Sequence, residues 1–196
     1  MKKTLIAAAV FLIIVLFPVD CLSQFYAGAG FNYAIPNGKL KEINAESIGF
    51  NLQLESRKYC RWWYGLRIDY LSFEKVVDID EITGYYENEV LISPTIRFNI
   101  IPHTYDATGK SKLSNRFIPY LQGMFNISSI RGTDKANQLG FGAALGGGVA
   151  YSFTLFNTCW LIDLNGLYSA PNSITRTGSR PSLETILVSF SVSTCL

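Results

Sequence analysis

The sequence predicts an all-β fold, an eight-stranded antiparallel up-and-down barrel that spans a membrane and follows a cleavable signal peptide. Stretches of alternating apolar and polar residues recur along the chain, and successive strand side chains point to opposite faces, so each stretch has one apolar and one polar face. Aromatic residues gather at the ends of these stretches. Charged residues make up 16% of the chain, below the share of about a quarter in soluble domains. These observations favour a barrel whose outer wall contacts lipid.

The first 23 residues have the layout of a secretory signal peptide. A short basic start precedes an apolar run from Leu5 to Phe17, which is shorter than the roughly 20 residues of a transmembrane helix. We expect cleavage after Ser23, so that residues 24–196 form the barrel domain. An uncleaved anchor and a lipoprotein attached through Cys21 are the alternatives. The absence of a stop-transfer pattern disfavours the first, and the acidic residue before Cys21 disfavours the second.

The first four predicted strands cover residues 25–33, 46–56, 62–73 and 89–101. In the first, aromatic and small residues share one face, and the turn signal Pro36-Asn37-Gly38 follows. The second alternates most regularly, with one face formed by Ile48, Phe50, Leu52 and Leu54. The third continues this pattern after a tight connection. The fourth contains Pro94, which removes a ladder donor, but its alternation continues on both sides of this residue and predicts a strand.

The fifth and sixth predicted strands cover residues 117–128 and 139–153, the seventh is centred on residues 160–165, and the eighth runs from a loop ending at Pro181 to the C-terminus. The sixth has large apolar residues on one face and mostly glycine and alanine on the other. The last two carry large apolar residues at every second position, namely Trp160, Ile162 and Leu164 in one and Ile186, Val188, Phe190 and Val192 in the other.

The connections and the aromatic residues orient this barrel. Four longer loops are expected on one side and shorter connections on the other, with residues 102–115 as the exception. In an up-and-down membrane barrel the longer loops lie outside the cell. Aromatic residues cluster near both sets of strand ends, which is the arrangement that the two membrane interfaces select.

Three segments resemble strands of the small eight-stranded outer-membrane barrels, the group that contains the OmpA transmembrane domain and OmpX. They are Pro94-Thr-Ile-Arg-Phe98, Pro119-Tyr-Leu-Gln-Gly123 and the glycine-rich run from Gly140 to Val149. The resemblance implies insertion into a bacterial outer membrane, with its lipids and the barrel-assembly machinery as partners, and it implies no activity. The chain departs from the group at its C-terminus, which is Thr194-Cys195-Leu196 instead of ending in an aromatic residue.

Charge and motif content exclude several function classes. The chain has 17 basic and 15 acidic residues; removal of two lysines and one aspartate with the signal peptide leaves 17 − 2 = 15 and 15 − 1 = 14. Because the mature chain is almost neutral and has no clustered basic stripe, we expect no nucleic-acid partner. It also lacks a metal cluster, a phosphate-binding loop and a nucleophile motif, so we expect no metal and no cofactor.

Five charged residues fall on predicted inward faces: Glu55, Arg67, Asp69, Arg97 and Asp163. If the third and fourth strands pair symmetrically about the middle of the acidic loop between them, Arg67 and Arg97 lie nearly opposite each other, with Asp69 close to both. An eight-stranded barrel is just wide enough to be filled by side chains, so we expect these charges to form a hydrogen-bonded ionic network. Such a network either plugs the lumen or acts as a gate for small ions.

Two cysteines fall on the last two predicted strands. Reflection about residue 177 sets Cys159 directly opposite Cys195, and both are in phase with inward residues. The periplasm permits disulfides, so a cross-strand bridge is one interpretation and two buried thiols are the other. Cys60 is left over in a predicted periplasmic turn, where an intermolecular disulfide is one interpretation.

We therefore expect a non-enzymatic outer-membrane barrel that contributes to membrane integrity, interacts with an extracellular partner through its loops, or passes small solutes to a limited extent. A lipid-modifying outer-membrane enzyme is one alternative, but it resembles barrels that use a histidine near the outer leaflet, and the single histidine, His103, falls on the periplasmic side. A soluble exported barrel of the lipocalin type is the other. It requires an apolar interior, whereas the inward face predicted here is strongly polar.

Overall fold

The computed structural model describes residues 24–42, 44–57, 61–75, 86–101, 116–132, 137–156, 158–174 and 183–196. The predicted signal peptide, Cys60 and His103 lie outside these residues. The strands are β1 (Gln24–Pro36), β2 (Asn44–Arg57), β3 (Trp62–Lys75), β4 (Tyr86–Asn99), β5 (Arg116–Gly132), β6 (Asn137–Leu155), β7 (Thr158–Ala170) and β8 (Thr185–Cys195). Among the described residues, no helix is long and apolar enough to cross a membrane.

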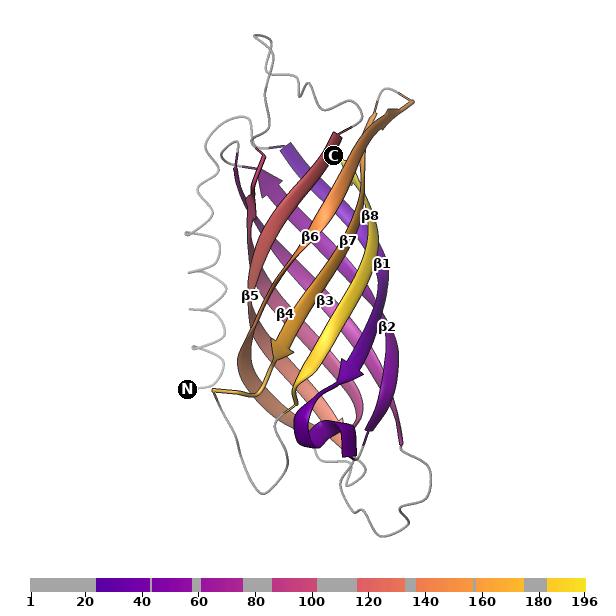
Figure 1. Cartoon of the computed structure of the whole chain (residues 1–196), viewed down its shortest axis with the longest axis vertical. Coiled ribbons are helices and arrows are strands. Elements are labelled where there is room, and N and C mark those ends of the chain that lie inside the picture. Colours follow the sequence, from indigo (N-terminus) through magenta and orange to yellow (C-terminus); the bar gives the residue numbers. More distant parts are fainter. Residues whose placement is uncertain are drawn as a thin grey trace.

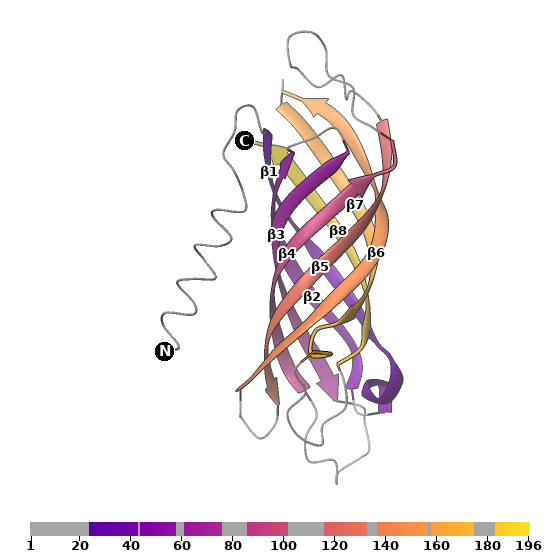
Figure 2. The same cartoon turned by 90° about the vertical axis from the view of Figure 1, so that its left-hand side faces the viewer.

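The eight strands form a closed barrel in which each strand pairs with its neighbours in the sequence and β8 returns to β1 (Figures 1 and 2). Every pairing is antiparallel, and the closing pair sets Phe31 opposite Phe190. Closure leaves no strand edge without a partner. The predicted all-β, eight-stranded, up-and-down barrel is confirmed.

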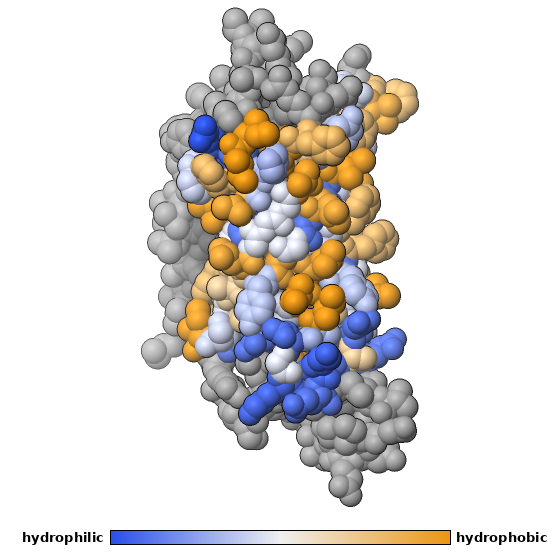
Figure 3. All heavy atoms as spheres, viewed as in Figure 1, coloured by the Kyte–Doolittle hydropathy of each residue, from blue (hydrophilic) through white to orange (hydrophobic). Residues whose placement is uncertain are grey.

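Alternation along each strand separates an apolar outer wall from a largely polar lumen. Phe31, Ile48 and Leu145 on the outer wall are 70%, 70% and 74% exposed. Asn32, which follows Phe31 on β1 and points the other way, is 2% exposed. A shift of one residue in register would exchange the two faces of a strand. Figure 3 shows the apolar residues as a broad band on the wall and hydrophilic residues gathered at one end of the barrel.

The strands are longer than predicted, and this changes two connections. β1 extends through Pro36 and is followed by a short 3-10 helix, η1 (Gly38–Glu42), in which Gly38 has a φ of 56°, a conformation that glycine adopts without steric cost. β5 ends at Gly132 and β6 begins at Asn137. The connection predicted as one of four longer loops is therefore short, because the alternation continues to Ile130 and both strands absorb the predicted loop.

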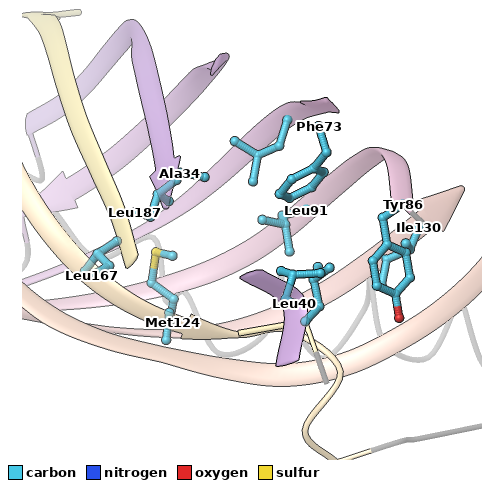
Figure 4. Packing of buried hydrophobic residues seen from close by; sticks show 12 residues of the cluster. Ala34, Leu40, Phe73, Tyr86, Leu91, Met124, Ile130, Leu167 and Leu187 are labelled. Carbon is cyan, nitrogen blue, oxygen red and sulfur yellow. The ribbon is translucent and has the colours of Figure 1, made fainter. Parts of the chain in front are cut away.

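Two apolar layers fill the lumen near its ends. The layer at the η1 end contains 12 buried residues, among them Leu40 of η1, Leu91, Tyr86 and Ile130 (Figure 4). η1 is held over this end by a hydrogen bond from the Asn37 amide to the Glu184 carbonyl, 2.8 Å long. The layer at the opposite end, where β1 begins and β8 ends, is formed by Tyr26, Trp63, Ile118, Tyr120, Ala150 and Leu161. Buried polar and charged residues occupy the lumen between the two layers.

Candidate functional site in the barrel lumen

All five charged residues predicted to face inward are buried in the lumen, with exposed fractions of 0–5%. The predicted juxtaposition of Arg67 and Arg97 is wrong. In the β3–β4 pairing, Arg67 is opposite Ser93 and Arg97 is opposite Trp63, a displacement of four residues from the symmetric arrangement. The reason is that β4 begins at Tyr86, within the stretch predicted as loop. The position about which the two strands pair therefore lies closer to β3 in the sequence than the predicted reflection point. The charges consequently divide into two groups.

The first group, the Arg67 cluster, consists of Arg67, Asp69, Asn32, Asn51 and Ser189. Arg67 Nε donates to Asp69 Oδ1 at 2.7 Å, and its terminal nitrogen donates to Asn32 Oδ1 at 2.9 Å and Ser189 Oγ at 2.6 Å. Asn32 Nδ2 also donates to Asp69 Oδ1, and Asn51 Nδ2 donates to Asn32 Oδ1, both at 2.7 Å. These bonds join β1, β2, β3 and β8 across the lumen.

The second group, the Arg97 cluster, consists of Arg97, Glu55, Asp163, Tyr120 and Trp63. Arg97 Nη1 lies 3.0 Å from Asp163 Oδ2 and 3.6 Å from Glu55 Oε2. The hydroxyl of Tyr120 donates to Asp163 Oδ1. The guanidinium carbon of Arg97 is 3.5 Å from the Tyr120 ring centroid and 4.4 Å from that of Trp63, so the charge is also stabilised by two aromatic faces.

Several members of both clusters are absent from the five predicted residues. Asn32, Ser189 and Tyr120 each occupy an inward-facing position of their strand. The alternation of the sequence could therefore have assigned them to the lumen. Their hydrogen-bond partners come from strands that are distant in the sequence. Alternation along one strand cannot identify those partners.

The two clusters can neutralise and hold charge inside a narrow lumen. A charge-assisted hydrogen bond in a site of low dielectric is strong, and removing one partner leaves a buried charge uncompensated. Among the described residues, no group of three or more histidine, cysteine, aspartate or glutamate side chains is arranged to hold a metal ion. The geometry is that of a filled polar core crossed by ion pairs.

The register of the last hairpin brings the two predicted cysteines to facing positions. The β7–β8 pairing ends with Trp160 opposite Thr194, so Cys159 and Cys195 are the next residues on the two strands. Both side chains are thiols in the structure and pack against the apolar layer at the end opposite η1. Tyr26 OH donates to Cys159 Sγ at 3.6 Å. The disulfide between them stays a prediction.

Known structures of similar architecture share this fold at low sequence identity. The crystal structure of Neisserial surface protein A superposes with a TM-score of 0.52 at 13% identity, covering 90% of this chain and 99% of that one. Ail, the attachment invasion locus protein of Yersinia pestis, gives 0.42 at 14% identity, and its complex with the heparin analogue sucrose octasulfate gives 0.40 at 11%. Both Ail comparisons cover 88% of this chain and 95% of Ail. No family model and no curated protein matches the chain. The chain has the fold of the small eight-stranded outer-membrane barrels.

Proposed function

We propose that this protein spans the bacterial outer membrane as a closed, non-enzymatic barrel that contributes to membrane integrity and presents its loops to an extracellular partner. The observation that carries the proposal is the apolar outer wall. Large apolar side chains project outward from every strand, for example Phe31, Phe50, Ile68, Ile96 and Leu164. Monomeric proteins in water rarely expose contiguous apolar patches beyond a few hundred Å², whereas a lipid-facing wall requires them.

The polar lumen supports this proposal over a soluble lipocalin-type barrel. Such a barrel would bind an apolar ligand inside and keep its polar side chains outside. Here the two arginine clusters and a series of buried serine and asparagine residues lie inside, and the apolar residues lie outside. Membrane barrels have this inverted arrangement because lipid is the solvent of their outer wall.

The filling of the lumen supports a closed barrel over a conducting one. Apolar side chains occupy both ends of the lumen, and Trp63 and Leu40 within these layers are 1% and 0% exposed. Between them, Arg67 on β3 donates hydrogen bonds to Asn32 on β1 and Ser189 on β8, and Arg97 on β4 forms an ion pair with Asp163 on β7. Eight strands enclose an interior that side chains can fill. We therefore favour the structural plug over the ion gate.

The position of the single histidine supports a non-enzymatic role. A lipid-modifying barrel of the kind considered above needs a histidine near the outer leaflet, with a serine and an acid as partners. His103 is the only histidine in the sequence, and it falls between β4 and β5. In an up-and-down barrel the connection from β4 to β5 is at the end where β1 begins and β8 ends, opposite the η1 end.

Cell fractionation combined with gel migration before and after boiling tests the proposal. We expect the mature protein, beginning at Gln24, in the outer-membrane fraction, with a folded band that shifts when the sample is boiled. Recovery from the soluble periplasm without detergent would overturn the membrane assignment. Planar-bilayer recording tests the closed lumen separately: we expect no steady conductance, and reproducible unitary currents would show that the clusters form a gate.

A further inference from the structure

Three buried oxygen atoms on neighbouring strands accept no hydrogen bond from any residue that the structure describes. They are Oδ1 of Asn51 on β2, Oδ2 of Asp69 on β3 and Oε1 of Glu89 on β4. The three residues are 1%, 0% and 1% exposed. Buried acceptors in proteins are almost always satisfied by a donor or a ligand, so three of them on adjacent strands call for a positively charged or donating partner.

The strand register brings these three side chains to one place. Asn51 is directly opposite Asp69 in the β2–β3 pairing. Asp69 is opposite Leu91 and Leu71 is opposite Glu89 in the β3–β4 pairing, so Asp69 and Glu89 are diagonal neighbours on the same inward face, within reach of long side chains. Asn51, Asp69 and Glu89 thus form an acidic group on the inward face of three adjacent strands, beside the Arg67 cluster.

The formal charges of this acidic group and its neighbours do not balance. Among the described side chains, the buried cations are Arg67 and Arg97. Arg67 is paired with Asp69 at 2.7 Å, and Arg97 is paired with Asp163 and Glu55. Glu89 therefore has no protein cation of its own among these residues. An ionised carboxylate without a counter-charge is strongly disfavoured in such a site.

The surroundings of Glu89 make this imbalance more severe. Leu71 is its partner on β3 and Ile130 is its partner on β5, and both belong to the apolar layer at the η1 end. Figure 4 shows the side chains of this layer, including Leu91, two residues along β4 from Glu89. An apolar wall on both sides offers no donor to the carboxylate.

We infer that Asn51, Asp69 and Glu89 bind one small hard monovalent cation of the sodium class. Two carboxylate oxygens and one amide oxygen are ligands that hard cations prefer. With both carboxylates ionised, the formal charges of Arg67, Asp69 and Glu89 sum to one negative charge, and a monovalent cation neutralises it. A divalent cation would leave an uncompensated positive charge next to Arg67 and the apolar layer. The site would link β2, β3 and β4 from within the lumen.

Crystallography with thallium(I), a heavy monovalent cation with an anomalous signal, tests the site directly. The barrel is refolded and crystallised in thallium acetate without chloride, so that the cation is present while the lumen closes. We expect an anomalous peak in contact with Asp69 Oδ2 and Glu89 Oε1, and no such peak in the Glu89→Gln protein. The absence of a peak at this place in the unmodified protein would overturn the inference.

Thermal unfolding in detergent provides an independent measurement in solution. At pH 8.5 and constant ionic strength, sodium replaces N-methylglucamine, a much larger monovalent cation, and the temperature at which the folded gel band disappears is recorded. We expect this temperature to rise with sodium and to saturate, because a ligand that binds only the folded state stabilises it. Glu89→Gln should abolish the rise. Glu87→Gln is the matched control, since Glu87 is partly exposed and pairs with Arg131.

Either of two results in this series would overturn the cation site. A sodium-dependent rise that persists in Glu89→Gln would place sodium elsewhere on the protein. The second result is the absence of a response to sodium, combined with an unfolding temperature that falls as the pH is raised in the unmodified protein but not in Glu89→Gln. It would show that the site holds a proton in place of a metal cation.

Discussion

Arg97 on β4 and Asp163 on β7 form an ion pair with an Nη1–Oδ2 distance of 3.0 Å, although their strands do not pair with each other in the wall. The same Nη1 atom lies 3.6 Å from Glu55 on β2. One side chain thus links three separate parts of the barrel through its interior. Because these contacts join separate strands from the inside, we expect the lumen side chains to stabilise the closed wall.

Asp163→Asn should destabilise the barrel by about 3–5 kcal/mol, because it leaves the buried Arg97 with Glu55, at 3.6 Å, as its remaining carboxylate partner. Urea-induced unfolding in lipid vesicles, followed by tryptophan fluorescence, measures the change. Glu87→Gln is the control, since it removes a partly exposed pair with Arg131 at 3.7 Å and should change stability by less than about 1 kcal/mol. Equal effects of the two variants would show that the lumen pair makes no special contribution.

Gly148→Ala should weaken the same cluster by steric means. A Cβ atom at this position would lie 2.6 Å from the Tyr120 hydroxyl and 2.4 Å from the Leu164 carbonyl oxygen, whereas one at Gly166 would meet no atom within 4 Å. We expect a loss of about 1–3 kcal/mol from overpacking in Gly148→Ala and almost none in Gly166→Ala, measured by the same urea titration. A Gly148→Ala protein as stable as the parent would contradict the close packing around Tyr120.

Leu164→Arg tests whether the wall contacts lipid. Leu164 lies near the middle of β7 and is 56% exposed, and an arginine at the bilayer midplane destabilises outer-membrane barrels by about 2–4 kcal/mol. Phe156→Arg is the matched control, because Phe156 lies in the turn between β6 and β7, where the same change should have little effect. The comparison is made by unfolding in vesicles. If both substitutions were neutral, the outer wall would face water.

A disulfide between Cys159 and Cys195 is expected in protein exported to an oxidising compartment, because the β7–β8 register brings the two residues to facing positions. Thiol alkylation of the denatured, non-reduced mature protein, followed by mass spectrometry, should modify one cysteine, Cys60. Cys60→Ser should then show no reactive thiol, and Cys159→Ser should lose about 2–4 kcal/mol of stability. Modification of three thiols in the mature protein would refute the bridge.

The local pattern of the sequence determined which residues form strands and which face of each strand is apolar. Alternation has a period of two residues, and it is visible within a single strand without knowledge of its neighbours. This is why Ile48, Phe50 and Leu164 could be assigned to the outer wall and Arg67 and Asp163 to the lumen. The same pattern allowed Pro94 to be kept within β4.

Hairpin registers were predictable only where the turn could be located. The β7–β8 register agrees with reflection about residue 177, because the ends of the two strands were clear in the sequence. The β3–β4 register differs by four residues, because β4 begins at Tyr86 within a stretch that has loop composition. An acidic, polar stretch does not indicate where the loop ends and the next strand begins. For this reason the predicted juxtaposition of Arg67 and Arg97 is wrong.

Only the closed barrel decided which lumen side chains meet. Asp163 reaches Arg97 from a strand three positions around the wall, and Ser189 reaches Arg67 from the last strand of the chain. These contacts depend on the tilt and stagger with which the eight strands close, and no single strand or hairpin contains that information. The sequence by itself determined the faces of the wall, and the tertiary structure determined the partners inside it, because faces follow from local periodicity and partners follow from closure.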